Sequence, residues 1–331
     1  MNVELKSYAD RAGNPIVEAG RLGAVPAPPK TAGLLWVTYK KDLEWFEFSA
    51  RSYAKYARGW DFAKCIVPNE DLRAFNPVCE SNGIELWGDD RWKDKPFNSH
   101  QNVKCHADVH MPGADVIFHC DADCVFAKEC SPSDWLPNGK VLMPYQNYET
   151  YLNRPIGPDE MADFMSGKKI DASLAQYNWR FAVEAALGRN VERECMWGLP
   201  IVHRREVYKK TRQLISERFP KEKFDGYVRS CRDTYQQSFC EFNTLGAVAH
   251  IYFEDYYEWW DANARGYPPT YGKIIQSWSH GGLDGKYDYL GKAGDKTIDT
   301  ARKLFVSLGL LETKKKRTLR EIWHQFMDTP K

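Results

Sequence analysis

Residues 34–39 read LLWVTY, and this apolar run begins the pattern that decides the fold. Branched and aromatic residues of this kind favour an extended strand. Asp42 follows, and residues 43–53 then carry apolar side chains at helical spacing, so we expect a helix with Asp42 as its cap. A strand followed at once by an amphipathic helix is the first half of a βαβ unit.

The same alternation continues along the chain. Strands are expected at 62–67, 84–87, 115–120 and 141–145, and helices at 69–81 (capped by Asn69), 99–109, 159–189 and 204–219. Strands that alternate with helices at this spacing predict an α/β fold, with a mostly parallel central sheet flanked by helices. Residues 241–252 suggest an amphipathic helix and a strand, and residues 296–327 a helical C-terminal extension.

The composition excludes several classes of protein. Of 331 residues, 43% are hydrophobic and 27% charged, and the formal net charge is +1, so no strong overall field attracts nucleic acid or an acidic membrane. No run of about 18 apolar residues occurs, so we expect no membrane span. The nine cysteines form no paired knuckles and follow no signal peptide, which predicts reduced thiols in a cytoplasmic protein and argues against zinc.

Two carboxylates follow the expected strand at 115–120. Asp121 and Asp123, with the small Ala122 between them, come directly after the apolar run at 116–118. In open α/β sheets, ligands bind beyond the carboxyl ends of the strands. Hard carboxylate oxygens suit Mn²⁺ or Mg²⁺, and such an ion can offset the charge on a departing diphosphate. The sequence therefore predicts that Asp121 and Asp123 hold a divalent metal ion.

This segment resembles a known signature. Residues 116–126, VIFHCDADCVF, are similar to the Asp-x-Asp segment of glycosyltransferases of the GT-A fold, a Rossmann-like architecture. Many members also carry a Gln and a Lys on the preceding helix, to which Gln101 and Lys104 correspond. The resemblance implies a metal-dependent enzyme that moves a sugar from a nucleoside-diphosphate sugar, with a UDP-sugar favoured, to an acceptor hydroxyl.

A second, weaker similarity lies downstream. Residues 280–286 read HGGLDGK, with the His-to-Lys spacing of retaining members, in which the His completes the metal shell and the Lys contacts the diphosphate. The Pro-Trp that normally follows the Lys is absent. Together the similarities imply metal ligands Asp121, Asp123 and His280. They imply donor contacts from Thr38, Tyr39, Gln101, Lys104, Asp121, Ala122, Asp123, Gly281, Gly282 and Lys286.

The resemblance suggests a division of the chain into a leader at 1–30, a donor-binding half at 31–150, an acceptor-binding and catalytic half at 151–295, and a tail at 296–331. In the third part, Glu241 is the preferred catalytic carboxylate, although Ser238 and Glu241 also form an ordinary capping-box pattern. Asp225 is a second candidate, and Asp233 a weaker one.

Aromatic residues supply the acceptor-site candidates. Trp197 and Gly198 are candidates for an acceptor pocket, because an exposed Trp can stack on a sugar. A core Trp at this position is an equal alternative. We expect the aromatic cluster at 256–260 to pack inside the protein, with a platform for a sugar or a base as the alternative.

Other functions remain open from the sequence. A Mg²⁺-dependent nucleotidyltransferase would also use two carboxylates, but it usually has a glycine-rich loop after its first strand, and residues 38–42 contain no glycine. A non-catalytic module that binds sugar or nucleic acid is a further alternative. The acceptor is expected to be a glycan or, as a second choice, a hydroxylated base in DNA, which the basic run at 314–320 could hold.

Overall fold

The computed structural model describes residues 8–9, 15–16, 27–148, 175–196, 198–233, 239–276 and 303–311. Two short antiparallel strands stand near the start, β1 (Tyr8–Ala9) and β2 (Pro15–Ile16). Within the described ranges, no helix is long and apolar enough to cross a membrane.

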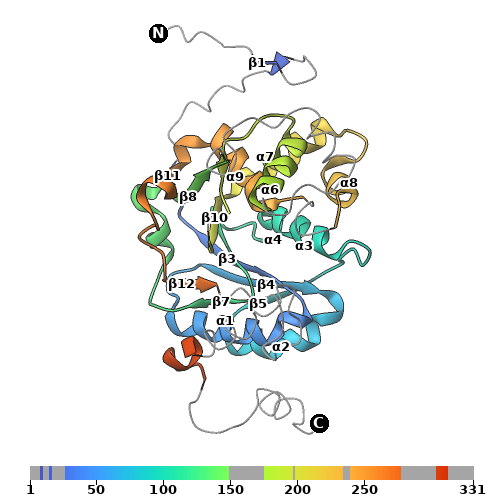
Figure 1. The fold of residues 1–331 in the computed structure, drawn as a ribbon. Helices are drawn as coiled ribbons and strands as arrows, with labels where there is room; N and C mark the ends of the chain where they lie inside the picture. Colours follow the sequence, from blue (N-terminus) through green and yellow to red (C-terminus); the bar gives the residue numbers. More distant parts are fainter. Residues whose placement is uncertain are drawn as a thin grey trace.

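A five-stranded sheet forms the centre of the protein (Figure 1). Its order is β10-β6-β3-β4-β5, with β3 (Ala32–Val37), β4 (Phe62–Pro68), β5 (Glu85–Asp89), β6 (Val116–Cys120) and β10 (Ile201–Arg204). The strands β3, β4, β5 and β6 pair in parallel, and β10 pairs antiparallel to β6. The predicted α/β fold with a mostly parallel central sheet is confirmed.

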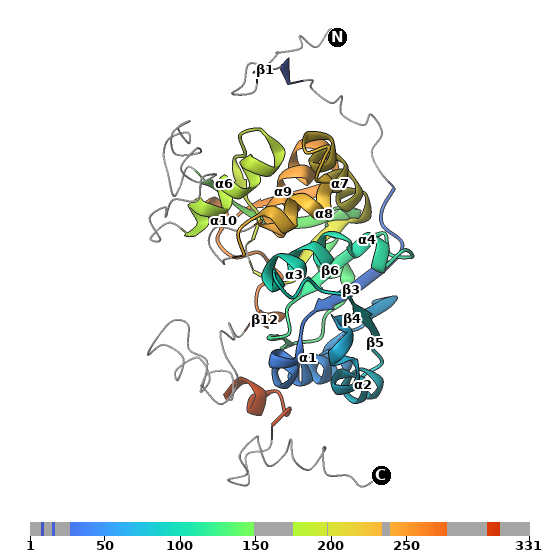
Figure 2. The same cartoon turned by 90° about the vertical axis from the view of Figure 1, so that its right-hand side faces the viewer.

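Helices cover both sides of this sheet (Figures 1 and 2). On one side lie α1 (Leu43–Tyr56) and α2 (Leu72–Ser81); on the other lie α3 (Pro96–Cys105) and α4 (Ala107–His110). Right-handed crossovers explain this, because the chain moves outward from β3 to β5 and then returns past β3 to β6. Beyond α3 and α4 lie α6 (Ala175–Leu187), α7 (Arg205–Arg218), α8 (Lys223–Ser230) and α9 (Glu241–Tyr252).

Two smaller sheets extend the centre. One has the order β11-β8-β9, formed by β11 (Tyr257–Asp261), β8 (Val141–Asn147) and β9 (Arg193–Glu194). The other pairs β7 (Cys124–Phe126) with β12 (Ile274–Gln276). Short helical turns are η1 (Lys40–Asp42), η2 (Asn69–Asp71), η3 (Pro132–Trp135), η4 (Pro137–Gly139), η7 (Glu254–Tyr256) and α10 (Ala262–Arg265).

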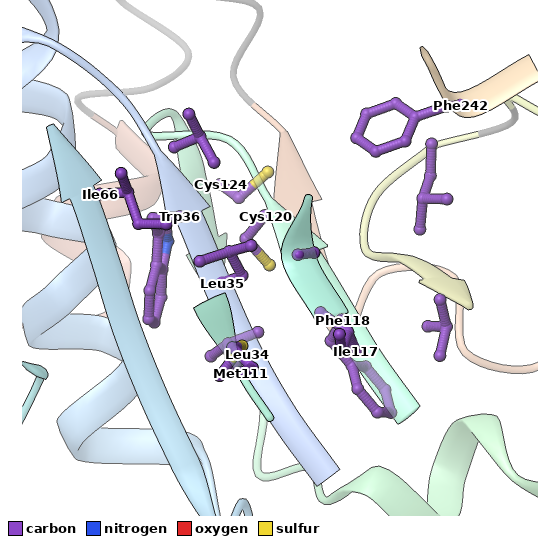
Figure 3. Packing of buried hydrophobic residues seen from close by; sticks show 14 of the residues in the cluster. Leu34, Leu35, Trp36, Ile66, Met111, Ile117, Phe118, Cys120, Cys124 and Phe242 are labelled. Carbon is purple, nitrogen blue, oxygen red and sulfur yellow. The ribbon is translucent and has the colours of Figure 1, made fainter. Parts of the chain in front are cut away.

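The core is centred on the strands β3 and β6 (Figure 3). Leu34, Leu35 and Trp36 have no exposed surface, and neither has Phe118 on the neighbouring strand. The buried Trp36 indole N–H donates to the Ser49 hydroxyl at 2.9 Å, which satisfies the one polar atom that its burial removes from water. This packing fixes the strands whose ends carry the predicted site.

Residues 303–311 pack onto α1. The Phe305 ring stacks on Phe48 with 4.2 Å between centroids, and the Lys55 ammonium donates to the Leu308 carbonyl at 2.6 Å. Residues 303–307 are helical. The rest of the predicted helical tail lies outside the described residues.

Several local predictions need correction. Asp42 and Asn69 do not cap helices with their side chains; the Asn69 amide donates to Asp90 instead. The helix predicted at 99–109 is divided into α3 and α4, and β5 begins one residue later than expected. Residues 241–252 form one helix that is buried nearly all round for its first nine residues, so it is neither amphipathic nor part strand.

Candidate functional site

The predicted acidic pair lies at the carboxyl edge of the central sheet. Trp36 of β3 pairs with Cys120 of β6, so the residues that follow both strands begin at the same level. Asp121 follows β6, and Thr38 and Tyr39 follow β3. The parallel register therefore brings the two predicted donor-binding segments to one edge, as the general rule for open α/β sheets requires.

The turn from residue 121 to residue 124 holds the acidic pair. The Cys124 amide donates to the Asp121 carbonyl at 3.1 Å, and β7 starts at once. Ala122 is buried, and Asp123 keeps only 6% of its surface exposed, whereas the side chain of Asp121 is 32% exposed. Asp121 is thus the carboxylate that solvent reaches more easily.

A buried lysine connects this turn to another part of the fold. The Lys104 ammonium lies 3.0 Å from Asp121 Oδ1 and 3.2 Å from Glu241 Oε1. Burial by itself would lower the pKa of Lys104, but the Asp121 and Glu241 carboxylates outweigh it and raise this pKa above its ordinary value. Lys104 therefore stays charged, and it joins the predicted donor residue Asp121 to the predicted catalytic residue Glu241.

A third carboxylate, which the sequence reading treated only as a cap, faces the acidic pair. Burial and then the charges of Asp123 and Asp121 raise the pKa of Asp42 to about 7. Its side chain makes no capping hydrogen bond to α1. An acid directly after the first parallel strand lies at the same edge as Asp121, so the topological rule could have identified it.

The other predicted donor residues occupy the same edge. Thr38 is 1% exposed, and its backbone N–H donates to the Ile66 carbonyl at 3.0 Å; Tyr39 is 40% exposed. Gln101 is buried one helical turn before Lys104, so both lie along one side of α3. Its amide oxygen has no hydrogen-bond partner within the described part of the chain.

The guanidinium of Arg91, which was not predicted as a site residue, lies near the end of β4. Arg91 Nη2 donates to the Ile66 carbonyl at 3.0 Å, and Nη1 lies 3.4 Å from His100 Nδ1 on α3. Burial, followed by the charges of Lys104 and Arg91, lowers the pKa of His100 well below its ordinary value, so this imidazole is neutral. The spacing of Arg91 and His100 in the sequence does not predict that their side chains meet.

The antiparallel strand β10 brings the predicted acceptor segment to the acidic turn. Ile201, the first residue of β10, pairs with His119, so the chain enters β10 beside the end of β6. Two buried side chains hold this segment. Glu194 accepts the Met196 N–H at 2.8 Å, and Asn243 Oδ1 accepts the Cys195 N–H at 2.7 Å. Asn243 stands two residues after Glu241 on α9, so one helix contacts both Lys104 and the segment that contains Cys195.

The other carboxylate candidates lie elsewhere. Asp225, with 63% of its side chain exposed, accepts from Asn102 at 2.8 Å. Asn102 lies about 200° around α3 from Lys104, so Asp225 contacts the opposite side of that helix. Asp233 accepts the Asn98 N–H at 2.8 Å and thereby satisfies a donor in the first turn of α3.

Several predicted residues lie outside the described residues: Trp197, Ser238, His280, Gly281, Gly282, Lys286 and the basic run at 314–320. Within the described residues, no group of three His, Cys, Asp or Glu side chains is arranged to hold a metal ion. The strand β12 brings a residue the sequence did not indicate, because the Gln276 amide lies 3.4 Å from Asp121 Oδ2.

Comparison with known proteins adds no family. No protein-family model matches the chain, and no curated protein matches it. The functional interpretation therefore depends on the geometry of this edge of the sheet.

Proposed function

We propose that this protein is a metal-dependent glycosyltransferase that takes a sugar from a nucleoside-diphosphate sugar, a UDP-sugar in the first instance. The observation that carries the proposal is the position of Asp121 and Asp123 at the carboxyl end of a central parallel strand, with Lys104 and Glu241 converging on the same place. A GT-A-like arrangement is the finer description of the fold that goes with this proposal, and the sheet order β5-β4-β3-β6 is compatible with it.

Two residues at this edge have the chemistry that a divalent ion needs. Asp121 and Asp123 offer hard oxygen ligands, which Mn²⁺ and Mg²⁺ prefer. The raised pKa of Asp42 reflects, after burial, the negative charge of these two carboxylates, and a cation would offset that charge. When bound, the ion would neutralise charge on the departing nucleoside diphosphate. Asp121 and Asp123 would hold it, with His280 as a further proposed ligand.

The chain itself would bind and orient the donor. Tyr39 exposes an aromatic ring at the rim beside β3, where it can stack on a nucleobase. The unpaired amide oxygen of Gln101 can accept a hydrogen bond from a donor hydroxyl. Gly281, Gly282 and Lys286 remain proposed diphosphate contacts.

The acceptor would approach from the side of β10 and α9. Gly198 precedes β10, which the chain enters beside the end of β6, and Glu241 lies beside Lys104. In the transfer, the acceptor oxygen forms a bond to the anomeric carbon, the bond from that carbon to the diphosphate breaks with its electron pair leaving on the diphosphate, and the proton of the acceptor hydroxyl passes to a carboxylate. Glu241 is the proposed carboxylate of this step, with Asp225 as the alternative. Trp197 belongs to the same proposed acceptor region.

A thermal-shift screen tests the proposal. The purified chain is melted with UDP, GDP, CDP and their glucose conjugates, each with Mn²⁺, with Mg²⁺ or with EDTA. We expect one nucleoside diphosphate to raise the melting temperature only when metal is present. Absence of a response to every nucleotide would refute the proposal.

Two variants locate the binding. Asp123→Asn should remove the metal-dependent shift, and Asp94→Asn, which changes an exposed surface acid, should retain it. Donor hydrolysis measured by release of UDP should follow the same pattern. Release of pyrophosphate from a nucleoside triphosphate instead would identify a nucleotidyltransferase, and binding without turnover would identify a non-catalytic module. Glycan and hydroxymethylated DNA acceptors are then compared directly.

A further inference from the structure

Lys104 sits on the buried side of the acidic turn. Its side chain is 5% exposed and that of Glu241 is 8% exposed, while Asp121 is 32% exposed. The ammonium also lies 4.5 Å from the centre of the Phe242 ring, whose face attracts a cation. Lys104 is thus held by three groups, two of which belong to the first two residues of α9.

Both oxygens of Asp121 have donors close to them. Lys104 approaches Oδ1 at 3.0 Å, and the Gln276 amide approaches Oδ2 at 3.4 Å. A divalent ion from solvent would reach Asp121 from its exposed side, so it would share this one carboxylate with an ammonium already in contact. Two cations on one carboxylate repel each other, and the partly buried setting strengthens that repulsion.

We propose that Lys104 is a built-in counter-cation that competes with the divalent metal for Asp121, and that Glu241 sets the strength of this competition by holding the ammonium. The inference depends on the metal site of the proposed function. Without metal, Lys104 neutralises part of the charge of the acidic turn. With metal, its interaction shifts toward Glu241, which couples occupation of the metal site to the start of α9. Toward the metal ion, Lys104 and Glu241 act as positioning residues, and this role is separate from the carboxylate role proposed for Glu241 in the transfer.

The scheme predicts opposite effects for the two residues. Lys104→Met removes the competing charge, so Mn²⁺ should bind more tightly, by roughly tenfold for a unit charge in this setting. Among the described residues, Glu241→Gln leaves Lys104 with Asp121 as its one carboxylate partner at these distances, so Mn²⁺ should bind several-fold more weakly. Lys104→Arg keeps the charge and should not reproduce the gain. A purely structural role would weaken binding in every variant.

The measurement uses Mn²⁺ alone. Free hexaaqua Mn²⁺ is followed by electron paramagnetic resonance during titration of the full chain at fixed pH and ionic strength. Asp123→Asn serves as the metal-site reference. Lys64→Met is the matched control, because Lys64 is also buried but pairs with Glu85 at 3.3 Å on another strand. Circular dichroism and thermal melting establish that each variant is folded.

The results distinguish failure of the proposed competition from failure of the metal site itself. Tighter binding in Lys104→Met with weaker binding in Glu241→Gln supports the competition. Unchanged or weaker binding in a folded Lys104→Met overturns it, while Asp123-dependent binding by the unaltered chain would leave the metal site intact. If Lys104→Met does not fold, Glu241→Gln decides, and unchanged binding there overturns the proposal. If the unaltered chain binds no Mn²⁺, or binds it without Asp123, the metal site itself fails and both proposals fall.

Discussion

Removal of the buried lysine should have a large and specific effect on stability. Lys104→Met leaves Glu241, with 8% of its side chain exposed, as a buried charge without its ammonium partner. Removing one member of a buried ion pair costs about 3–5 kcal/mol. Asp121 adds little to this cost, because its side chain is 32% exposed and water can solvate it. We therefore expect the free energy of unfolding to fall by about 3–5 kcal/mol.

Two further variants separate the charge from the packing. In Glu241→Gln the amide oxygen can still accept from Lys104, and Lys104 keeps Asp121, so the cost should be only about 1 kcal/mol. The double variant removes both buried charges, so it should be more stable than Lys104→Met alone.

The assay is urea unfolding followed by circular dichroism, with EDTA present so that metal binding does not contribute. A change in the midpoint at constant slope reports the change in stability. A Lys104→Met variant within about 1 kcal/mol of the unaltered chain would refute the assignment of a buried ion pair. The double variant tests the coupling between Lys104 and Glu241. If its loss of stability equals the sum of the losses in the two single variants, the coupling is refuted.

Three other changes follow from the same structure. The raised pKa of Asp42, about 7 against 3.8, means that the folded state retains a proton that the unfolded chain has lost, so stability falls as pH rises between these values. Asp42→Asn should remove this dependence in EDTA and stabilise the chain at pH 8 by on the order of 1 kcal/mol, after allowance for partial exposure. Phe118→Ala, at a side chain with no exposed surface, should cost about 3–5 kcal/mol in urea unfolding, whereas Val109→Ala, at a residue 59% exposed, should change stability by under about 0.5 kcal/mol. Gly246→Ala should destabilise despite better helix propensity, because the added methyl would lie 2.4 Å from Cys195 Cβ.

Clear results would contradict each of these. An equal pH dependence with and without Asp42 would show that another group titrates. Similar costs for Phe118→Ala and Val109→Ala would show that the core is centred elsewhere. A stabilised Gly246→Ala, measured by thermal melting, would show that α9 does not lie in close contact with Cys195.

Local pattern was sufficient for the four parallel strands of the central sheet, but it did not predict the antiparallel edge strand β10. The apolar runs now seen as β3, β4 and β6 are short, fully or largely buried and separated by helical spacing, so their type and direction follow from period and length. The acidic turn after β6 was placed at the correct edge for the same reason, because consecutive parallel strands end on one side. The cap predictions at Asp42 and Asn69 were wrong: the Asn69 amide donates to Asp90 instead, and Asp42 precedes α1 without a side-chain hydrogen bond to the helix.

The charged contacts across the site were decided by tertiary structure alone. Lys104 and Glu241 are 137 residues apart, and only the packing of α3 against α9 brings their charges within 3.2 Å. The pairing of β12 with β7, which carries Gln276 to Asp121, likewise joins segments 155 residues apart. The periodicity and composition of a segment predict which of its sides is buried. They do not predict which charged residue, distant in the sequence, will contact that segment in the fold. The sequence thus determined the parallel strands and the position of Asp121 and Asp123 after one of them, while the folded chain decided that a buried lysine contacts Asp121.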